Sequence, residues 1–182
     1  MATKVVTGKV RFSYVHVFEP WSGQEGQPAK YSVCVLIPKE DKKTLVKIKA
    51  AMDEAIQNGV ASQWGGKQPK NLHLPLRDGD EERADEYPEY KGMMFLNANS
   101  KNAPGVVDKD LNVILDSEEF YSGCWGRASV NFFAYDSNGN RGIGCGLNNI
   151  QTLKDGERLG AARASAEDDF GDGFDDDDED DF

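Results

Sequence analysis

The sequence predicts a mainly β protein, in which five or six short strands form a strongly curved barrel. One amphipathic helix and long loops elaborate this barrel, and a disordered acidic tail follows it. Three observations predict this class. Apolar residues follow strand periodicity in several separate stretches. One stretch alone has helical periodicity. The last sixteen residues contain eleven acids and no base, a composition that cannot bury enough apolar surface to fold.

The first two strands are predicted at residues 9–18 and 31–37. In the first, side chains alternate between two faces, and we expect Phe12 to be buried and Arg11 to be exposed. The second reads YSVCVLI and is almost continuously apolar, which is typical of a central strand covered on both faces. Pro38 is expected to end it.

A helix is predicted to begin after Asp41 and to stop at Gly59. Asp41 is a favourable N-cap residue, and Leu45, Ile48 and Met52 recur at intervals of three and four. Lysines occupy the remaining positions. They form either a phosphate-binding face or, as is more common on helices, a solvated surface.

Residues 60–91 lack periodicity and divide by charge. The first half carries Lys67, Lys70 and Arg77 near Trp64, whereas residues 78–89 carry seven acids around the lone Arg83. Outside residues 78–89 and the tail, the chain has six more bases than acids. The net charge of residues 1–166 is zero, but the sequence predicts that part of their surface is basic. The acids of residues 78–89 share one polar loop, so a solvated loop is expected there rather than a nuclease-like metal site.

Four further strands are predicted downstream. Residues 93–98 and 111–115 form short strands on this interpretation. Residues 127–135 and 141–150 form a long hairpin around the Asn138-Gly139 turn. Glycines at positions 142, 144 and 146 indicate bends or a close backbone approach, as in a small curved barrel.

One face of the strand at residues 127–135 combines aromatic rings, a guanidinium and short polar groups. Arg127, Phe133 and Tyr135 share this face, although each ring could instead pack beneath the helix. Rings framed by cations suit unpaired bases, because bases stack on the rings while the cations meet the phosphates. The sequence therefore predicts a single-stranded nucleic-acid surface. The candidate DNA-binding residues are Arg11, Tyr14, Lys30, Tyr31, Trp64, Lys67, Lys70, Arg77, Arg127, Phe133, Tyr135 and Arg141.

Enzymatic and metal chemistry is not expected. The sequence has no phosphate-binding loop, no Gly-x-Ser-x-Gly elbow and no His-Glu-x-x-His motif. Cys34, Cys124 and Cys145 lack Cys-x-x-Cys spacing, so they are predicted to be buried, reduced thiols, and neither zinc nor another cofactor is expected. No apolar run has the length of a signal peptide or a membrane span. We therefore expect a cytoplasmic protein that does not contact membranes.

The acidic tail at residues 167–182 accounts for the whole net charge of −11. It either keeps the protein soluble or acts as a detachable polyanion that imitates nucleic acid. On the second interpretation it competes with DNA and then offers Asp175, Asp176, Asp177, Asp178 and Phe182 to partner proteins. The predicted division is a DNA-binding domain at 1–156, a linker at 157–166 and the tail.

The chain resembles the single-stranded DNA-binding proteins of tailed phages. The most specific part lies between residues 121 and 156, with YSG at 121–123, WGR at 125–127 and GLNNIQ at 146–151, and the similarity extends from about Val10. The acidic tail with its final Phe fits the same pattern. The resemblance implies an oligonucleotide-binding (OB) barrel that holds single-stranded DNA during replication or recombination and is not an enzyme. Replication or recombination proteins are the expected partners of the tail, and a phage-encoded chain is expected in the host cytoplasm.

An alternative class is an acidic protein-interaction module or DNA mimic, in which the barrel only carries the tail. The basic, aromatic face of the body argues against this alternative, because a mimic should be acidic throughout. A metal-dependent nuclease is a third possibility, and it would cleave DNA when magnesium is added.

Overall fold

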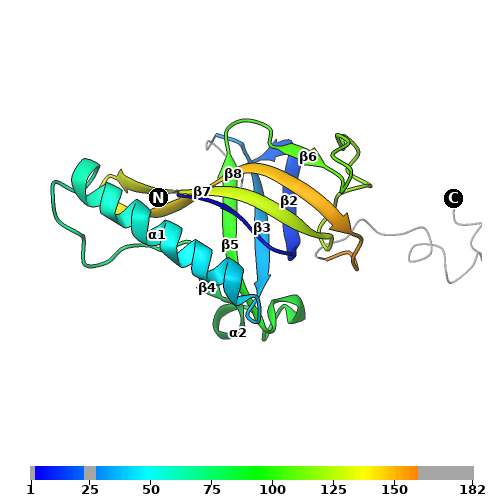
Figure 1. Cartoon of the computed structure of the whole chain (residues 1–182), viewed down its shortest axis with the longest axis horizontal. Helices are drawn as coiled ribbons and strands as arrows, with labels where there is room; N and C mark the ends of the chain where they lie inside the picture. Colours follow the sequence, from blue (N-terminus) through cyan, green and yellow to red (C-terminus); the bar gives the residue numbers. More distant parts are fainter. Residues whose placement is uncertain (1–2, 23–27, 160–182) are drawn as a thin grey trace, which may run out of the picture.

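The structure, a computed structural model, describes residues 3–22 and 28–159. Strands are the main regular elements of the described chain, and there is one long helix (Figure 1). The elements are β1 (Lys4–Val6), β2 (Val10–Trp21), β3 (Lys30–Pro38), α1 (Lys42–Ser62), β4 (Arg77–Asp78), α2 (Gly79–Glu82), the 3-10 helix η1 (Pro88–Tyr90), β5 (Met93–Ser100), β6 (Gly105–Val107), β7 (Trp125–Ser137) and β8 (Asn140–Lys154).

Five strands form a ring that is nearly a closed barrel. Strands β2, β3 and β5 follow one another as antiparallel neighbours, and β7 and β8 form the predicted hairpin. The ring closes where β5 runs parallel to β8 and where β2 meets β7. In Figure 1, β7 and β8 cross in front of the other three strands. This order is that of an OB barrel, which confirms the predicted fold class.

The barrel core follows from the alternation of side chains along the hairpin. On β7, Ala128, Val130 and Phe132 are buried, whereas the residues between them are exposed or partly exposed. On β8, Ile143 and Cys145 enter the same core. The two faces predicted for this strand are therefore confirmed. Within the described residues the cysteines are free and buried, as predicted.

Helix α1 covers the inner face of the hairpin. The Asp41 carboxylate accepts a hydrogen bond from the Thr44 amide, so the predicted N-cap is confirmed. The predicted stop at Gly59 is wrong, since the helix continues to Ser62. Gly59 instead provides a close approach. A Cβ there would lie 2.5 Å from the Cβ of Ala134 and 2.8 Å from the indole of Trp64.

The strand predicted at residues 111–115 is also wrong. Only Val113 forms a bridge, to Val107, and Leu111, Val113 and Leu115 are 71%, 70% and 83% exposed. These apolar side chains have no apolar surface to pack against, so their alternation in the sequence does not produce a strand. The strand in this region is β6, which runs parallel to β8.

The acidic residues 78–89 do not form a simple solvated loop. They contribute α2 and η1, which fold against the outer face of β3 and β5. A second small core forms there from Cys34, Leu36, Tyr90, Met93 and Phe95. The nitrogen of Lys39 lies 2.8 Å from carboxylates of both Asp78 and Asp80 and fastens this segment to the end of β3.

Strand β8 extends to Lys154, and the described chain after it remains in contact with the barrel. The Leu159 amide donates a hydrogen bond to the carbonyl of Ser122, and the Arg11 guanidinium donates to the carbonyl of Glu157. The tail and residues 160–166 lie outside the described residues, so the predicted three-part division stays a prediction. Among the described residues, no helix has the length and apolar character needed to cross a membrane.

Candidate nucleic-acid interface

A row of residues from β2, β3, β5 and the two strands of the hairpin runs across the outer face of the barrel. In register, His16 lies opposite Ser32, Ser32 opposite Asn99, Asn99 opposite Gly146, and Gly146 opposite Asn131. Directly paired residues project to the same side of a sheet. The row therefore presents small and amide-bearing side chains on the surface, and we call it the outer row.

An aromatic groove lies at the β2 end of the outer row. It has a volume of about 460 Å³, and Tyr14, Trp21 and Arg83 line it. The Trp21 ring stacks on His16 with a centroid distance of 5.0 Å and an interplanar angle of 12°. Trp21 is 55% exposed and Tyr14 is 46% exposed. Burial lowers the pKa of His16, so this stacked imidazole is neutral at pH 7. The groove thus offers exposed ring faces, as unpaired bases require.

Tyr14 reaches the groove through an unusual backbone conformation. Its φ angle is 47°, a left-handed value that costs roughly 1 kcal/mol or more for a residue with a side chain. The register between β2 and β3 shifts between Ser13 and His16, so Tyr14 lies in a bulge. A bulge re-aims side chains, and here the Tyr14 ring contributes to the lining of the groove.

Arg83 supplies a cation at the wall of this groove. Its guanidinium carbon lies 5.9 Å from the ring centroids of Tyr87, Tyr90 and Phe95. These rings hold the side chain in place by cation–π contacts. Arg83 is the single base among residues 78–89, the acidic segment, and it lies at the groove.

The second aromatic position lies on the hairpin. Phe133 is 48% exposed and is paired with Gly144. A Cβ at Gly144 would lie 2.5 Å from the Phe133 ring, so the ring lies directly against the bare backbone of this glycine. The glycines predicted to allow a close approach thus form a floor for an exposed ring. Beside it, the Asn148 amide donates to Asn131 Oδ1 at 3.3 Å.

Several predicted DNA-binding residues have structural partners instead. Trp64 is 5% exposed, and its indole donates to the Tyr135 carbonyl, so its ring is not available for stacking. Arg11 lies 5.6 Å from the Trp125 ring and is only partly exposed. Two other guanidiniums are paired with carboxylates, Arg77 with Glu82 and Arg141 with Asp136.

The other predicted residues divide between the groove, the hairpin and a loop. Lys30 is exposed and pairs in register with Trp21 beside the groove, and Tyr31 is partly exposed next to it. Tyr135 is partly exposed on the hairpin. Lys67 and Lys70 are exposed in the loop after α1.

Sequence reasoning missed part of the candidate interface. Trp21, Ser32, Arg83, Asn97 and Asn99 were not among the candidates, although they line the groove or the outer row. A signal was present for the asparagines, because they alternate with the buried Leu96 and Ala98 along β5. No local signal predicts that Arg83 turns toward the groove, since that depends on packing between distant segments.

A five-stranded barrel with an aromatic groove on its outer face defines the class of oligonucleotide-binding domains. The comparisons with known proteins give the family. A model described as "Enterobacter phage Enc34, ssDNA-binding protein" matches residues 3–182. The chain belongs to this family of phage single-stranded DNA-binding proteins. This confirms the predicted resemblance and the prediction of a non-enzymatic binding protein.

Three relatives illustrate the similarity. Protein p50 of Acyrthosiphon pisum secondary endosymbiont phage 1 is 31% identical over 180 residues, which cover 93% of each chain. The single-stranded DNA-binding protein from bacteriophage Enc34, solved in complex with ssDNA, matches with a TM-score of 0.77 and 26% identity, over 87% of this chain and 90% of that chain. The single-stranded DNA-binding protein gp2.5 of bacteriophage T7 has a TM-score of 0.62 and 12% identity, over 89% and 97% of the two chains. This last match concerns the fold alone.

Proposed function

We propose that this protein coats single-stranded DNA with little sequence preference and protects it during phage replication or recombination in the host cytoplasm. The observation that carries the proposal is the outer row, which has exposed aromatic rings at both ends and amide side chains between them. The Enc34 relative, solved with ssDNA, supports it.

The proposed contacts divide by chemistry. Tyr14 and Trp21 stack bases at one end of the outer row, and Phe133 stacks a base at the other. Every base has a π face, so stacking gives affinity with little sequence preference. Lys30 and Arg83 lie beside the groove and meet phosphates. The asparagines of the row donate and accept hydrogen bonds without a fixed base pattern.

The tail has a separate role in this proposal. Its eleven acids form a polyanion that competes with DNA for the cations of the barrel. Tethering gives such a segment an effective concentration that is roughly millimolar, so weak contacts are sufficient. When DNA displaces the tail, Phe182 and the acids before it become available to replication or recombination proteins.

Binding of a labelled oligonucleotide over a range of salt concentrations tests the function. We expect the logarithm of the affinity to fall linearly with the logarithm of salt, with a slope of about −0.7 for each neutralised phosphate. Duplex DNA of the same length should bind more weakly, because its bases cannot stack on the rings. Equal affinity for duplex, or no dependence on salt, would overturn the proposal. Cleavage on addition of magnesium would instead indicate a nuclease.

A further inference from the structure

A second hollow lies away from the aromatic groove, between β1 and α1. Its volume is about 470 Å³. Val5, Val6, Ala50 and Ala51 give it an apolar floor, and no carboxylate lines it. We call it the β1–α1 pocket. Strand β1 ends the order of the sheet, so one of its edges has no strand partner among residues 3–22 and 28–159.

Three cations line this pocket, namely Lys4, Lys47 and Arg127. Within the described part of the chain, no carboxylate lies within ion-pair distance of any of them. Arg127 is held in place because its Nε donates to the Thr7 carbonyl at 3.0 Å. An apolar floor surrounded by unpaired cations suits a ligand that combines an apolar group with several negative charges.

The chain itself contains such a ligand. Asp175–Asp178, Glu179, Asp180 and Asp181 form an unbroken run of seven acids directly before Phe182. No other phenylalanine of the tail follows so many acids. Seven consecutive carboxylates repel one another, and cations that have no carboxylate partner among the described residues relieve that repulsion.

We propose that Phe182 of the same molecule docks in the β1–α1 pocket, with the preceding acids against Lys4, Lys47 and Arg127. This proposal rests on the proposed function, in which the tail competes with DNA, and it specifies where the tail binds when DNA is absent. The ring covers the valines and alanines of the floor. The acids then lie near the outer face of the hairpin, because Lys4 pairs in register with Asn131 of the outer row. A docked tail therefore places its charge where DNA would approach.

The length of the tail permits this contact. Twenty-three residues follow Leu159, and a fully extended chain of that length reaches about 75 Å. A compact body of this size has a radius of gyration of roughly 15 Å. In Figure 1, β8 ends on the side of the barrel opposite to α1, so the tail must pass around the body, and it is long enough to do so.

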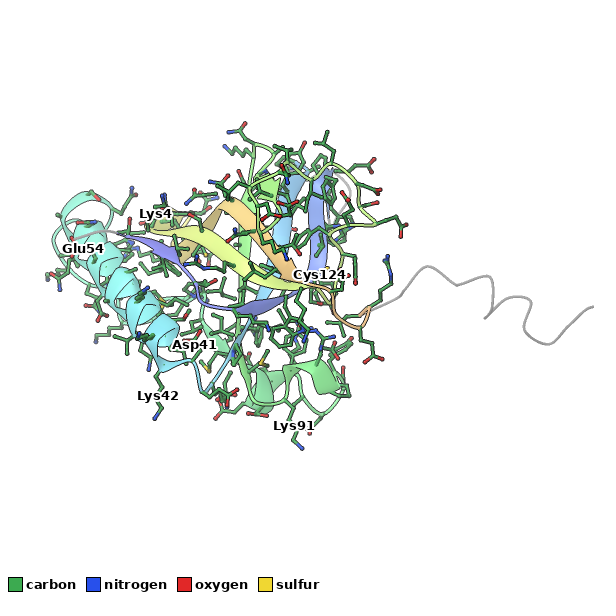
Figure 2. All side chains as sticks on the ribbon, turned by 45° about the vertical axis from the view of Figure 1, so that its right-hand side comes forward. Lys4, Asp41, Lys42, Glu54, Lys91 and Cys124 are labelled. Atoms are coloured by element: carbon green, nitrogen blue, oxygen red, sulfur yellow. The ribbon has the colours of Figure 1, made fainter. Side chains whose placement is uncertain are left out.

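The test uses the full-length protein and a zero-length carbodiimide cross-linker, which joins carboxylates to lysine amines. Cross-linked peptides are identified by mass spectrometry. We expect tail peptides to be joined to Lys4 and Lys47 at least about fivefold more often than to Lys42 and Lys49, since docking fixes the local concentration. Lys42 and Lys49 are exposed on the same helix, and Figure 2 shows Lys42 at the end of α1 remote from Glu54 and Lys4. Equal yields at the four lysines would overturn the proposal.

Two matched variants separate docking from general attraction. Ala50→Glu places a negative charge in the pocket, whereas Ala61→Glu places the same charge at another exposed position of α1. We expect Ala50→Glu and Phe182→Ala to reduce the Lys4 and Lys47 products to the level at the control lysines, and Ala61→Glu to leave them unchanged. Unchanged products in Phe182→Ala would overturn the docking of this ring.

Isotope labelling and DNA binding complete the test. In a mixture of ¹⁴N and ¹⁵N protein, cross-links should join peptides of one label. A majority of mixed products would mean that the tail occupies another copy and would overturn docking within one molecule. Ala50→Glu should bind single-stranded DNA at least as well as Ala61→Glu, and clearly weaker binding would make the pocket part of the DNA path. Failure of the wild type to bind DNA would refute the proposed function separately, because the cross-links are measured without DNA.

Discussion

At the scale of single residues, Tyr14 combines a strained backbone with an exposed ring. Non-glycine residues with positive φ persist where the surrounding structure imposes that conformation, and such sites cluster where ligands bind. Its φ of 47° is one that glycine adopts freely. If Tyr14 stacks a base, as the proposed function holds, fold stability and DNA binding make opposite demands at this position.

We predict that Tyr14→Gly separates these demands. Thermal unfolding should show a melting temperature equal to or above that of the wild type, because the variant relieves the left-handed strain. Affinity for single-stranded DNA should fall by roughly 1 to 3 kcal/mol, as expected for one lost stacking ring. Tyr14→Ala is the control, since it loses the ring and keeps the strain. If Tyr14→Gly binds DNA like the wild type, the ring has no part in the interface.

Phe133 and Lys30 are expected to differ in how salt affects their contributions to the affinity for single-stranded DNA. Phe133→Ala should lower affinity by roughly 1 to 3 kcal/mol without changing the salt slope, because stacking releases no counterion. Lys30→Gln should instead make the slope shallower by about 0.7, corresponding to one phosphate contact. Anisotropy titrations at four or five salt concentrations measure both effects. A changed slope in Phe133→Ala would contradict the assigned role.

At the scale of elements, Lys39 helps to hold the acidic segment, residues 78–89, at the end of β3. The hydrogen bond from Lys39 lowers the pKa of both Asp78 and Asp80 below the ordinary value, and the Gly92 amide adds to the effect at Asp80. A lowered pKa in the folded state means that the pairing stabilises the fold above the unfolded pKa of about 3.9 and is lost as pH falls through the folded pKa. Acid therefore removes the contribution of this ion pairing at the end of β3.

We predict that Lys39→Met loosens the segment at pH 7, much as acid does in the wild type below about pH 4. The amide of Gly92, which donates to Asp80 at 3.0 Å, should then exchange hydrogen faster, while core amides such as that of Phe132 should not. Arg83 should also lose its fixed position at the groove, so DNA affinity should fall modestly. Lys101→Met, at an exposed position outside this segment, is the control and should leave exchange at Gly92 unchanged. Unaltered exchange at Gly92 in Lys39→Met would show that the small aromatic core alone holds the segment.

At the scale of the whole molecule, charge is divided between a neutral body and an acidic tail. The net charge of −11 belongs to residues 167–182, so the tail repels DNA whenever it lies near the barrel. Screening weakens this repulsion, since the Debye length is about 10 Å at 0.1 M salt and about 30 Å at 0.01 M.

We predict that ending the chain after Ala166 increases affinity for single-stranded DNA, with the largest gain at low salt. Replacing the tail acids by their amides in the full-length chain should give the same gain, which controls for the change in length. Deleting Phe182 alone should impair recruitment of replication proteins while leaving all eleven acids of the tail in place. An unchanged affinity of the shortened chain at low salt would leave the tail as a solubilising or partner-docking segment only.

The sequence by itself determined the local elements and the distribution of charge. Alternation along residues 127–135 predicted which side chains enter the core, and Asp41 predicted the start of the helix, because both depend on neighbours a few positions away. The same local rule failed at residues 111–115, where alternation exists without a surface to cover. It also failed at Gly59, which is small because Ala134 and Trp64 pack against it.

Only the tertiary structure decided how the interface is assembled. The outer row needs the register between strands that are distant in sequence, such as Ser32 opposite Asn99 and Asn99 opposite Gly146. A bulge in β2 turns Tyr14 outward, and the packing of α2 and η1 brings Arg83 to the groove. Strand register and bulges are set by contacts between segments far apart in the chain. The periodicity of one segment therefore does not predict them.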